Sequence, residues 1–157
     1  ICKEAGITTG AFYHHFSSKE ALLESGFAPL DDYMAGALAG HEGEPPDLRL
    51  WRILSAYAKF MEQSGELIGR YYQRRIAEPG TRSMDATRYT LRAMLDCFRQ
   101  AEGEGLLRPE HPPEWVADFC FRHFRGVVID WALHQYSYPL LPKMQEDYKL
   151  FATLFHT

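Results

Sequence analysis

The chain has 157 residues, of which 46% are hydrophobic and 24% charged, a composition that is typical of globular proteins and unlike that of disordered chains. Three widely spaced cysteines without a CxxC pair do not indicate a disulfide scaffold, and no apolar run approaches the length of a membrane span. The net charge of −4 gives no support to nucleic-acid binding, since residues 1–48 hold eight acidic residues against two lysines. We therefore expect a cytoplasmic globular protein, in which DNA binding would have to rest on a motif.

Helical patterns follow one another along the chain, and no segment alternates between apolar and polar residues as a half-buried strand does. Clusters of Gly and Pro near residues 40–46, 78–81 and 103–113 separate the helical segments. We expect an all-α protein with helices at 18–38, 48–77, 83–102, 113–136 and 140–156, the second of them broken at Ser64-Gly65. The expected units are a head with its connecting helix, residues 1–38, and a helical body, residues 39–157.

The first residues carry the signals of a helix-turn-helix. The letters ICKEA are typical of the last turns of a helix, so we expect the biological chain to extend upstream of Ile1. Gly6 supplies a helix stop, and Thr8 can cap the next short helix. Ser17 and Glu20 then form a capping box for a third helix. Helix, glycine-containing turn and short helix together predict a helix-turn-helix, with a tight helical corner as the alternative.

Residues 6–22 read GITTGAFYHHFSSKEAL, and this stretch closely resembles the DNA-binding signature of TetR/AcrR-type transcriptional regulators. The resemblance implies that the short helix enters the major groove of operator DNA. It also implies that the first helix of that family has no counterpart in this sequence. The residues that the resemblance assigns to DNA contacts are Thr8, Thr9, Gly10, Ala11, Tyr13, His14, His15 and Lys19.

The segment 113–136 is apolar on two faces, and the segment 140–156 repeats the pattern. Both faces need to be covered, which favours a homodimer; a central helix buried in one large monomer is the alternative. The pattern Arg125-Gly126-x-x-x-Asp130-Trp131 resembles the C-terminal helix pair through which TetR-like regulators form dimers. The residues predicted at the dimer interface are Phe121, Val128, Trp131, Met144, Tyr148 and Phe151.

Aromatic residues and methionines recur throughout residues 48–102. In TetR-like proteins this region encloses a pocket for a small effector, so the resemblance implies a ligand that is largely apolar or aromatic. Each of these side chains could instead belong to the core. The ligand-binding candidates are Tyr57, Phe60, Tyr71, Tyr89, Phe98 and His123.

No phosphate-binding loop, dinucleotide fingerprint or nucleophile motif occurs, so we predict no enzyme, no catalytic residue and no cofactor. Cys120 and His123 could supply only half of a zinc site, and we predict no metal. The favoured function is a TetR-like repressor that a small ligand releases from DNA. The alternative is a helical, dimeric ligand-binding or interaction module with a vestigial DNA head, which the acidic charge of the head favours.

Overall fold

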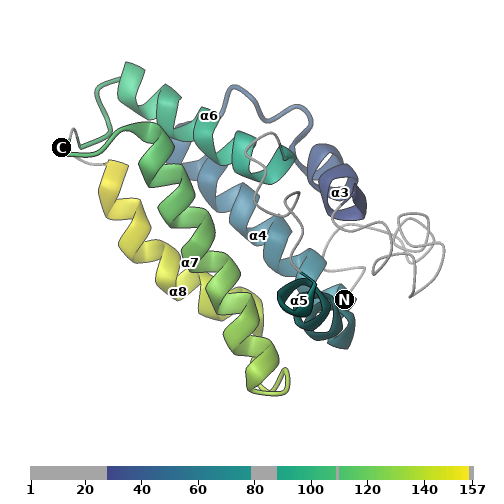
Figure 1. Cartoon of the computed structure of the whole chain (residues 1–157). Helices are drawn as coiled ribbons and strands as arrows, with labels where there is room; N and C mark the ends of the chain where they lie inside the picture. Colours follow the sequence, from purple (N-terminus) through teal and green to yellow (C-terminus); the bar gives the residue numbers. More distant parts are fainter. Residues whose placement is uncertain (1–27, 79–87, 109, 156–157) are drawn as a thin grey trace.

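A computed structural model of the chain describes residues 28–78, 88–108 and 110–155. Within these ranges the protein is all-α, as the sequence predicts, and holds no strand (Figure 1). The predicted helix-turn-helix and all eight candidate DNA contacts lie outside the described residues. The elements are α3 (Ala28–Leu38), α4 (Pro46–Ser64), α5 (Glu66–Ala77), α6 (Tyr89–Gly103), α7 (Pro113–Leu133), α8 (Leu140–Ala152) and the short 3-10 helix η2 (Thr153–Phe155).

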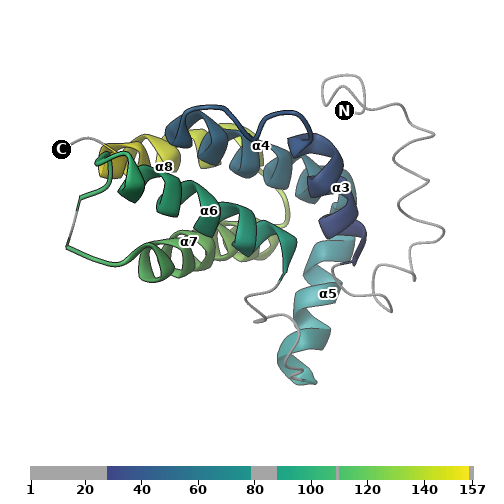
Figure 2. The ribbon, with the colours of Figure 1, turned by 90° about the horizontal axis from the view of Figure 1, so that it is seen from above.

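Four helices form the body in two layers. In Figure 2, α4 lies beside α8 in one layer and α6 lies beside α7 in the other, and α4 and α6 are also in contact. At one end of this bundle, α3 packs across α4 and α6, while α5 projects from the end of α4 and contacts α7. The first described helix therefore rests on the same end of the bundle from which α5 projects.

The break between α4 and α5 is confirmed at Gly65. Pro46 occupies the first turn of α4, where its missing N–H leaves no hydrogen bond unmade. Gly65 then takes a φ of 54°, a left-handed conformation that side chains disfavour, while its N–H donates to the Met61 carbonyl at 3.0 Å. The chain resumes as α5 in a new direction, so the aromatic side chains of α5 face those of α4.

Helix α7 ends earlier than the sequence predicted. Gln135 and Tyr136 both have positive φ, and this ends the helix at Leu133 instead of at residue 136. The turn is held by the Trp131 indole, which donates to the Tyr138 carbonyl at 2.8 Å. One carboxylate oxygen of Glu62 on α4 accepts the first N–H groups of α8, from Leu140 at 2.8 Å and Leu141 at 3.1 Å.

The core runs through all four bundle helices and is built mainly from large apolar side chains. Leu50, Leu54, Met61, Phe98 and Phe124 are each no more than 1% exposed. The apolar side chains of α4, α6 and α7 therefore pack against one another within a single chain. No helix in the described part of the chain is long and apolar enough to cross a membrane.

Candidate ligand-binding site

Three tyrosines gather where α4 meets α5, and we call them the tyrosine cluster: Tyr57, Tyr71 and Tyr72. Tyr57 is 1% exposed, and its hydroxyl lies 3.4 Å from that of Tyr72. The rings of Tyr71 and Tyr72 meet edge to face, with centroids 5.5 Å apart. Burial raises the pKa of all three phenols, most strongly that of Tyr72, so the cluster stays neutral at physiological pH.

Two arginines bring positive charge to the tyrosine cluster. Arg88, immediately before α6, has a side chain only 12% exposed and donates to an Asp31 carboxylate oxygen at 3.1 Å. Arg125 on α7 lies over the Phe121 ring, with 5.4 Å between its guanidinium carbon and the ring centroid. The positive charge of Arg88 opposes the burial effect on the pKa of Tyr57 and Tyr71, and that of Arg125 does so for Tyr57 and Tyr72.

Within the described residues, two side chains carry buried polar atoms that have no hydrogen-bond partner. Thr90, in the first turn of α6, is 1% exposed, and its hydroxyl is unpartnered. The amide nitrogen and oxygen of Gln63, near the end of α4, are also buried without partners. An unsatisfied buried polar group costs about 1–3 kcal/mol, so folded proteins rarely leave one without a role. Both residues lie on helix ends close to the cluster in sequence: Gln63 six residues beyond Tyr57, and Thr90 two beyond Arg88.

An open pocket of about 540 Å³ adjoins the cluster on the side of α5 that faces α7. Tyr72 joins the two, since it lines the pocket while its hydroxyl faces Tyr57. The pocket is mostly apolar, with charged residues at its rim. Its lining consists of Glu66, Gly69, Arg70, Tyr72, Gln73, Ile76, Ile129, Ala132, Leu133 and Tyr136.

One wall of this pocket depends on a glycine. The Tyr136 hydroxyl sits where a Cβ of residue 69 would be, and it donates to the Glu66 carbonyl at 3.4 Å. Gly69 thus allows Tyr136 to lie across α5. The left-handed turn at the end of α7 delivers Tyr136 to that position.

The structure brings only some of the predicted ligand-binding residues together. Tyr57 and Tyr71 belong to the tyrosine cluster, and Phe60 packs against Tyr33 of α3 at a centroid distance of 5.3 Å. Phe98 stacks on Phe155 toward the opposite end of α6, at 5.4 Å, as a core residue. Tyr89 lines a separate cleft described below.

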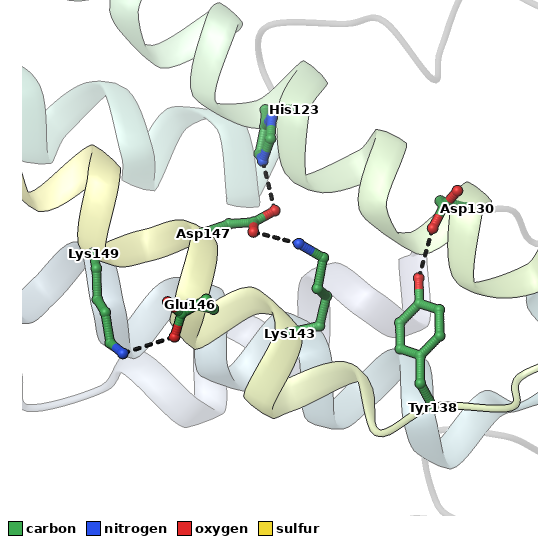
Figure 3. Close-up of polar contacts among 7 residues, drawn as sticks. All are labelled: His123, Asp130, Tyr138, Lys143, Glu146, Asp147 and Lys149. Carbon is green, nitrogen blue, oxygen red and sulfur yellow. Dashed lines mark hydrogen bonds and ion pairs between the residues drawn. The ribbon is translucent and has the colours of Figure 1, made fainter.

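His123, the sixth candidate, lies on the outer face of α7 (Figure 3). Its Nε2 is 3.0 Å from a carboxylate oxygen of Asp147 on α8, which also accepts from Lys143. Although partial burial raises the pKa of Asp147, these two partners lower it overall. Tyr138 donates to Asp130 at 2.9 Å in the same view, so polar contacts fasten the α7–α8 pair along its surface.

Sequence reasoning missed Tyr72, Thr90, Arg88 and Arg125 at this site. An expected apolar or aromatic ligand favours aromatic side chains and gives no reason to include arginines. The adjacent pair Tyr71-Tyr72 was the one available signal, because neighbouring helical residues point about 100° apart and two tyrosines can then line two sides of one space. Nothing in the local sequence indicates that Arg88 and Arg125, far apart in the chain, both act on the pKa of Tyr57.

The side chains predicted at the dimer interface face the interior of this chain. Phe121, Val128, Trp131, Met144 and Phe151 are at most 8% exposed, and the Tyr148 hydroxyl donates to the Asp47 carbonyl at 2.6 Å. The neighbouring helices α4, α5, α6 and α8 cover these faces. The outward face of α7 instead carries a stripe at spacings of three and four: Trp115, Phe119, Arg122, Gly126, Ile129 and Leu133.

The two described cysteines, Cys97 and Cys120, are buried thiols. Among the described residues, no group of three or more His, Cys, Asp or Glu side chains could hold a metal ion. Cys97 and Cys120 are fully buried, and burial raises the pKa of Cys97 to about 11 and that of Cys120 further. A thiol with so high a pKa is a poor nucleophile at neutral pH.

Comparison with known proteins shows what the chain is similar to. The family model described as "Bacterial regulatory proteins, tetR family" matches residues 1–25. The HTH-type transcriptional repressor DhaR of Mycobacterium sp. (strain GP1) is 26% identical over 152 residues, covering 89% of this chain and 74% of that protein. No solved structure gives a significant match. The chain is therefore similar to TetR-type helix-turn-helix regulators, as the signature in residues 6–22 predicted.

Proposed function

We propose that this protein is a transcriptional repressor that binds operator DNA as a homodimer and is released by a small ligand bound at the tyrosine cluster. The family match at residues 1–25 and the repressor named among its relatives support the DNA-binding part. Thr8, Thr9, Gly10, Ala11, Tyr13, His14, His15 and Lys19 are the proposed DNA contacts. We place the protein in the cytoplasm and assign it no catalytic role.

The observation that carries the ligand response is the Asp31–Arg88 ion pair. Asp31 lies in the first turn of α3, the first described helix after the matched segment, and Arg88 stands at the start of α6. The same arginine acts electrostatically on Tyr57 and Tyr71. A ligand that competes for Arg88 would therefore weaken the contact between α3 and the body. Ligand binding would shift the population of α3 positions and with it the placement of the DNA-binding heads.

The residues around the cluster narrow the class of ligand. Tyr57, Tyr71 and Tyr72 offer aromatic surface and hydroxyls, while Arg88 and Arg125 favour negative charge. The unpartnered Thr90 hydroxyl offers a further hydrogen bond. We infer a small aromatic ligand with an acidic group, which refines the apolar or aromatic ligand predicted from the sequence.

The ligand response can be tested with benzoate as the anionic aromatic probe and toluene as its neutral counterpart. Fluorescence anisotropy of the natural full-length protein on its promoter-region DNA should show binding that weakens steeply with salt. Benzoate should release the DNA and toluene should not. Release by toluene alone would overturn the acidic-ligand assignment.

Two variants distinguish the role of Arg88 in ligand binding from the role of the Asp31–Arg88 ion pair in holding α3 against the body. Arg88→Gln removes the proposed anion contact, so calorimetry should show weaker benzoate binding. Asp31→Asn breaks the same ion pair but keeps the guanidinium, so benzoate binding should persist while DNA affinity changes. If both variants keep full benzoate binding, the ligand does not use Arg88.

The dimer proposal rests on the stripe along the outer face of α7. Trp115 and Phe119 are each 43% exposed, stack at 5.2 Å and mark one end, while Leu133, 77% exposed, marks the other. Gly126 sits between them, and a Cβ there would meet nothing of this chain within 4 Å. Two copies of α7 crossing antiparallel at Gly126 would approach closely and cover both apolar ends.

Charge along α7 fits the same crossing. An antiparallel pair centred on residue 126 places Arg122 opposite the partner's Asp130, and Asp118 opposite the partner's His134. The crossing also brings Phe119 to the partner's Leu133, at the edge of the 540 Å³ pocket. Opposite charges thus meet at two pairs of positions in this crossing, and apolar groups meet at a third. The six residues predicted at the interface, five of them buried and Tyr148 half-buried, would support this surface from behind.

Sedimentation velocity tests this crossing with two matched glycine variants. Gly126→Leu puts a bulky side chain at the proposed axis, and Gly36→Leu does the same on α3, where a Cβ also meets nothing within 4 Å. We expect wild type and Gly36→Leu to be dimers and Gly126→Leu to dissociate. A dimeric Gly126→Leu variant would exclude an axis at this residue.

The alternative function is a dimeric ligand-binding module with a vestigial DNA head, favoured by the acidic charge of residues 1–48. It predicts that the protein binds its promoter-region DNA no more tightly than unrelated DNA at every salt concentration. A genomic fragment library would extend the search, and failure on all fragments would leave this alternative.

A further inference from the structure

A second, smaller cleft lies at the junction of the α3–α4 loop with α4 and α6. Its volume is about 230 Å³, and it shares no residue with the tyrosine cluster or with the larger pocket. Its lining consists of Leu38, His41, Glu42, Arg49, Ile53, Tyr89, Arg92, Ala93 and Asp96. The residues on α6 recur at spacings of three and four, so one face of that helix forms a wall of the cleft.

The cleft combines apolar groups with charges of both signs. Ile53, 1% exposed, together with Leu38 and Ala93, provides aliphatic surface. Two guanidinium groups, of Arg49 and Arg92, and two carboxylates, of Glu42 and Asp96, line the same space. The formal charge of these four side chains cancels, so the cleft favours neither a simple anion nor a simple cation.

The two charged side chains that α6 contributes to the cleft do not form an ion pair with each other. Arg92 and Asp96 stand four residues apart, a spacing that commonly forms a helical ion pair. The Arg92 guanidinium lies instead over the Tyr89 ring, 5.8 Å from its centroid. Among the described residues, the Asp96 carboxylate makes no hydrogen bond or ion pair. Arg49 donates from one nitrogen to Gln100 at 2.8 Å.

We propose that this cleft binds a small aliphatic zwitterion, such as an α-amino acid, with its carboxylate toward Arg92 and Arg49 and its ammonium toward Asp96. The aliphatic side chain would lie against Leu38, Ile53 and Ala93. A volume of 230 Å³ is below the range of about 300–1,000 Å³ of pockets for drug-sized ligands, which favours a compact molecule. This site is independent of the proposed effector site and of DNA binding.

The arrangement selects for both charges at once. A carboxylate alone would face Asp96 and Glu42 without compensation, and an amine alone would face the two arginines. Unlike charges near a protein surface attract at contact distance, and like charges repel. A zwitterion satisfies both sets of groups with one molecule.

Titration calorimetry with L-valine and its two half-molecules tests the proposal on the full chain. Isovalerate keeps the side chain and carboxylate but lacks the amine, while isobutylamine keeps the amine and lacks the carboxylate. We expect saturable binding of L-valine with a dissociation constant near or below about 1 mM, and binding at least about tenfold weaker for each half-molecule. Isovalerate or isobutylamine binding as tightly as L-valine would overturn the assignment.

Variants of residues inside and outside the cleft test where L-valine binds. Arg92→Gln and Asp96→Asn should each weaken L-valine binding about tenfold or more, while Arg99→Gln, on the same helix but paired with Glu114 outside the cleft, should leave it unchanged. Thermal unfolding of each variant checks that the fold is intact. Unchanged L-valine binding in both cleft variants, or no L-valine binding at all to wild type, would refute the proposal.

Discussion

The two ends of α6 stand in chemically different surroundings. Toward its C-terminal end, Phe98 stacks on Phe155 with rings 4° from parallel, and Cys97, Ala101 and Cys120 beside it are 0% exposed. At its N-terminal end, the unpartnered Thr90 hydroxyl and Arg88 stand close in the chain, and Arg88 acts on the tyrosine cluster. The C-terminal end is closely packed and apolar, and the N-terminal end holds a buried hydroxyl that has no hydrogen-bond partner among the described residues.

This contrast indicates a division of roles. The dry end gains stability from close packing alone, and no side chain there needs a partner from outside the chain. The polar end retains groups whose burial costs free energy, a pattern that natural proteins show mainly at functional sites. Substitutions at the two ends should therefore change the free energy of unfolding by different amounts and in different directions.

The largest effect is expected at the dry end. Phe98→Ala removes a fully buried ring and should lower the free energy of unfolding by about 3–5 kcal/mol, because the stacked Phe155 ring cannot fill the space. Chemical denaturation monitored by circular dichroism measures this change. Ile76→Ala, at a side chain 74% exposed, is the control and should change stability by less than about 0.5 kcal/mol. Equal losses for the two variants would show that the end around Phe98 is not the stabilising core.

Next in size is the contact between Gly69 and Tyr136. Gly69→Ala gains helix propensity but overlaps the Tyr136 hydroxyl, so we expect a net loss of about 1–2 kcal/mol in urea denaturation. Gly36→Ala, at an open helical position, should raise stability by up to about 1 kcal/mol. Tyr136→Phe should recover much of the loss in the Gly69→Ala background. A stabilised Gly69→Ala protein would mean that Tyr136 does not lie across α5.

The sequence predicted the fold more fully than the site, for a physical reason. Helices follow from local periodicity and from breakers, so the break at Gly65 and the all-α class were predictable. The end of α7 was not, because the left-handed Gln135 and Tyr136 carry no glycine to signal it. Apolar spacing reveals that a helix face is buried but not what covers it. Phe121 and Val128 were therefore assigned to a partner chain, although their own chain already buries them.

The candidate site depends on contacts between distant segments. Asp31 and Arg88 are 57 residues apart, and no local pattern joins them. Tyr57 and Tyr71 could be predicted as ligand-binding candidates because aromatic side chains are common in pockets for apolar ligands. Phe98 could not be told from them, since its role depends on Phe155 stacking against it.

A smaller effect, with a defined pH range, is expected at the tyrosine cluster. Burial raises the pKa of Tyr57 above its ordinary value of 10.0, so the folded protein keeps a proton that the unfolded chain loses. The stability from this group is complete below pH 10 and falls as the pH rises above it, by at most about 1.4 kcal/mol per pH unit. Urea denaturation at about pH 9 and about pH 11 should show a shallower loss for Tyr57→Phe than for wild type. Phe60→Leu, on the same helix, should lower stability equally at both pH values. A wild-type slope retained in Tyr57→Phe would assign the alkaline loss to other groups.

The smallest change in stability, and the one most specific to the polar end, is expected from Thr90→Val. The hydroxyl is buried and unpartnered, so replacing it with a methyl group should leave the free energy of unfolding unchanged or raise it by about 1 kcal/mol. Elsewhere in a core, the loss of a satisfied hydroxyl would lower stability by a similar amount. If Thr90 hydrogen-bonds the effector, the same variant should bind benzoate several-fold more weakly although it is no less stable. A destabilised Thr90→Val protein would show that the hydroxyl is satisfied without a ligand, for example by a buried water, and would remove Thr90 from the site.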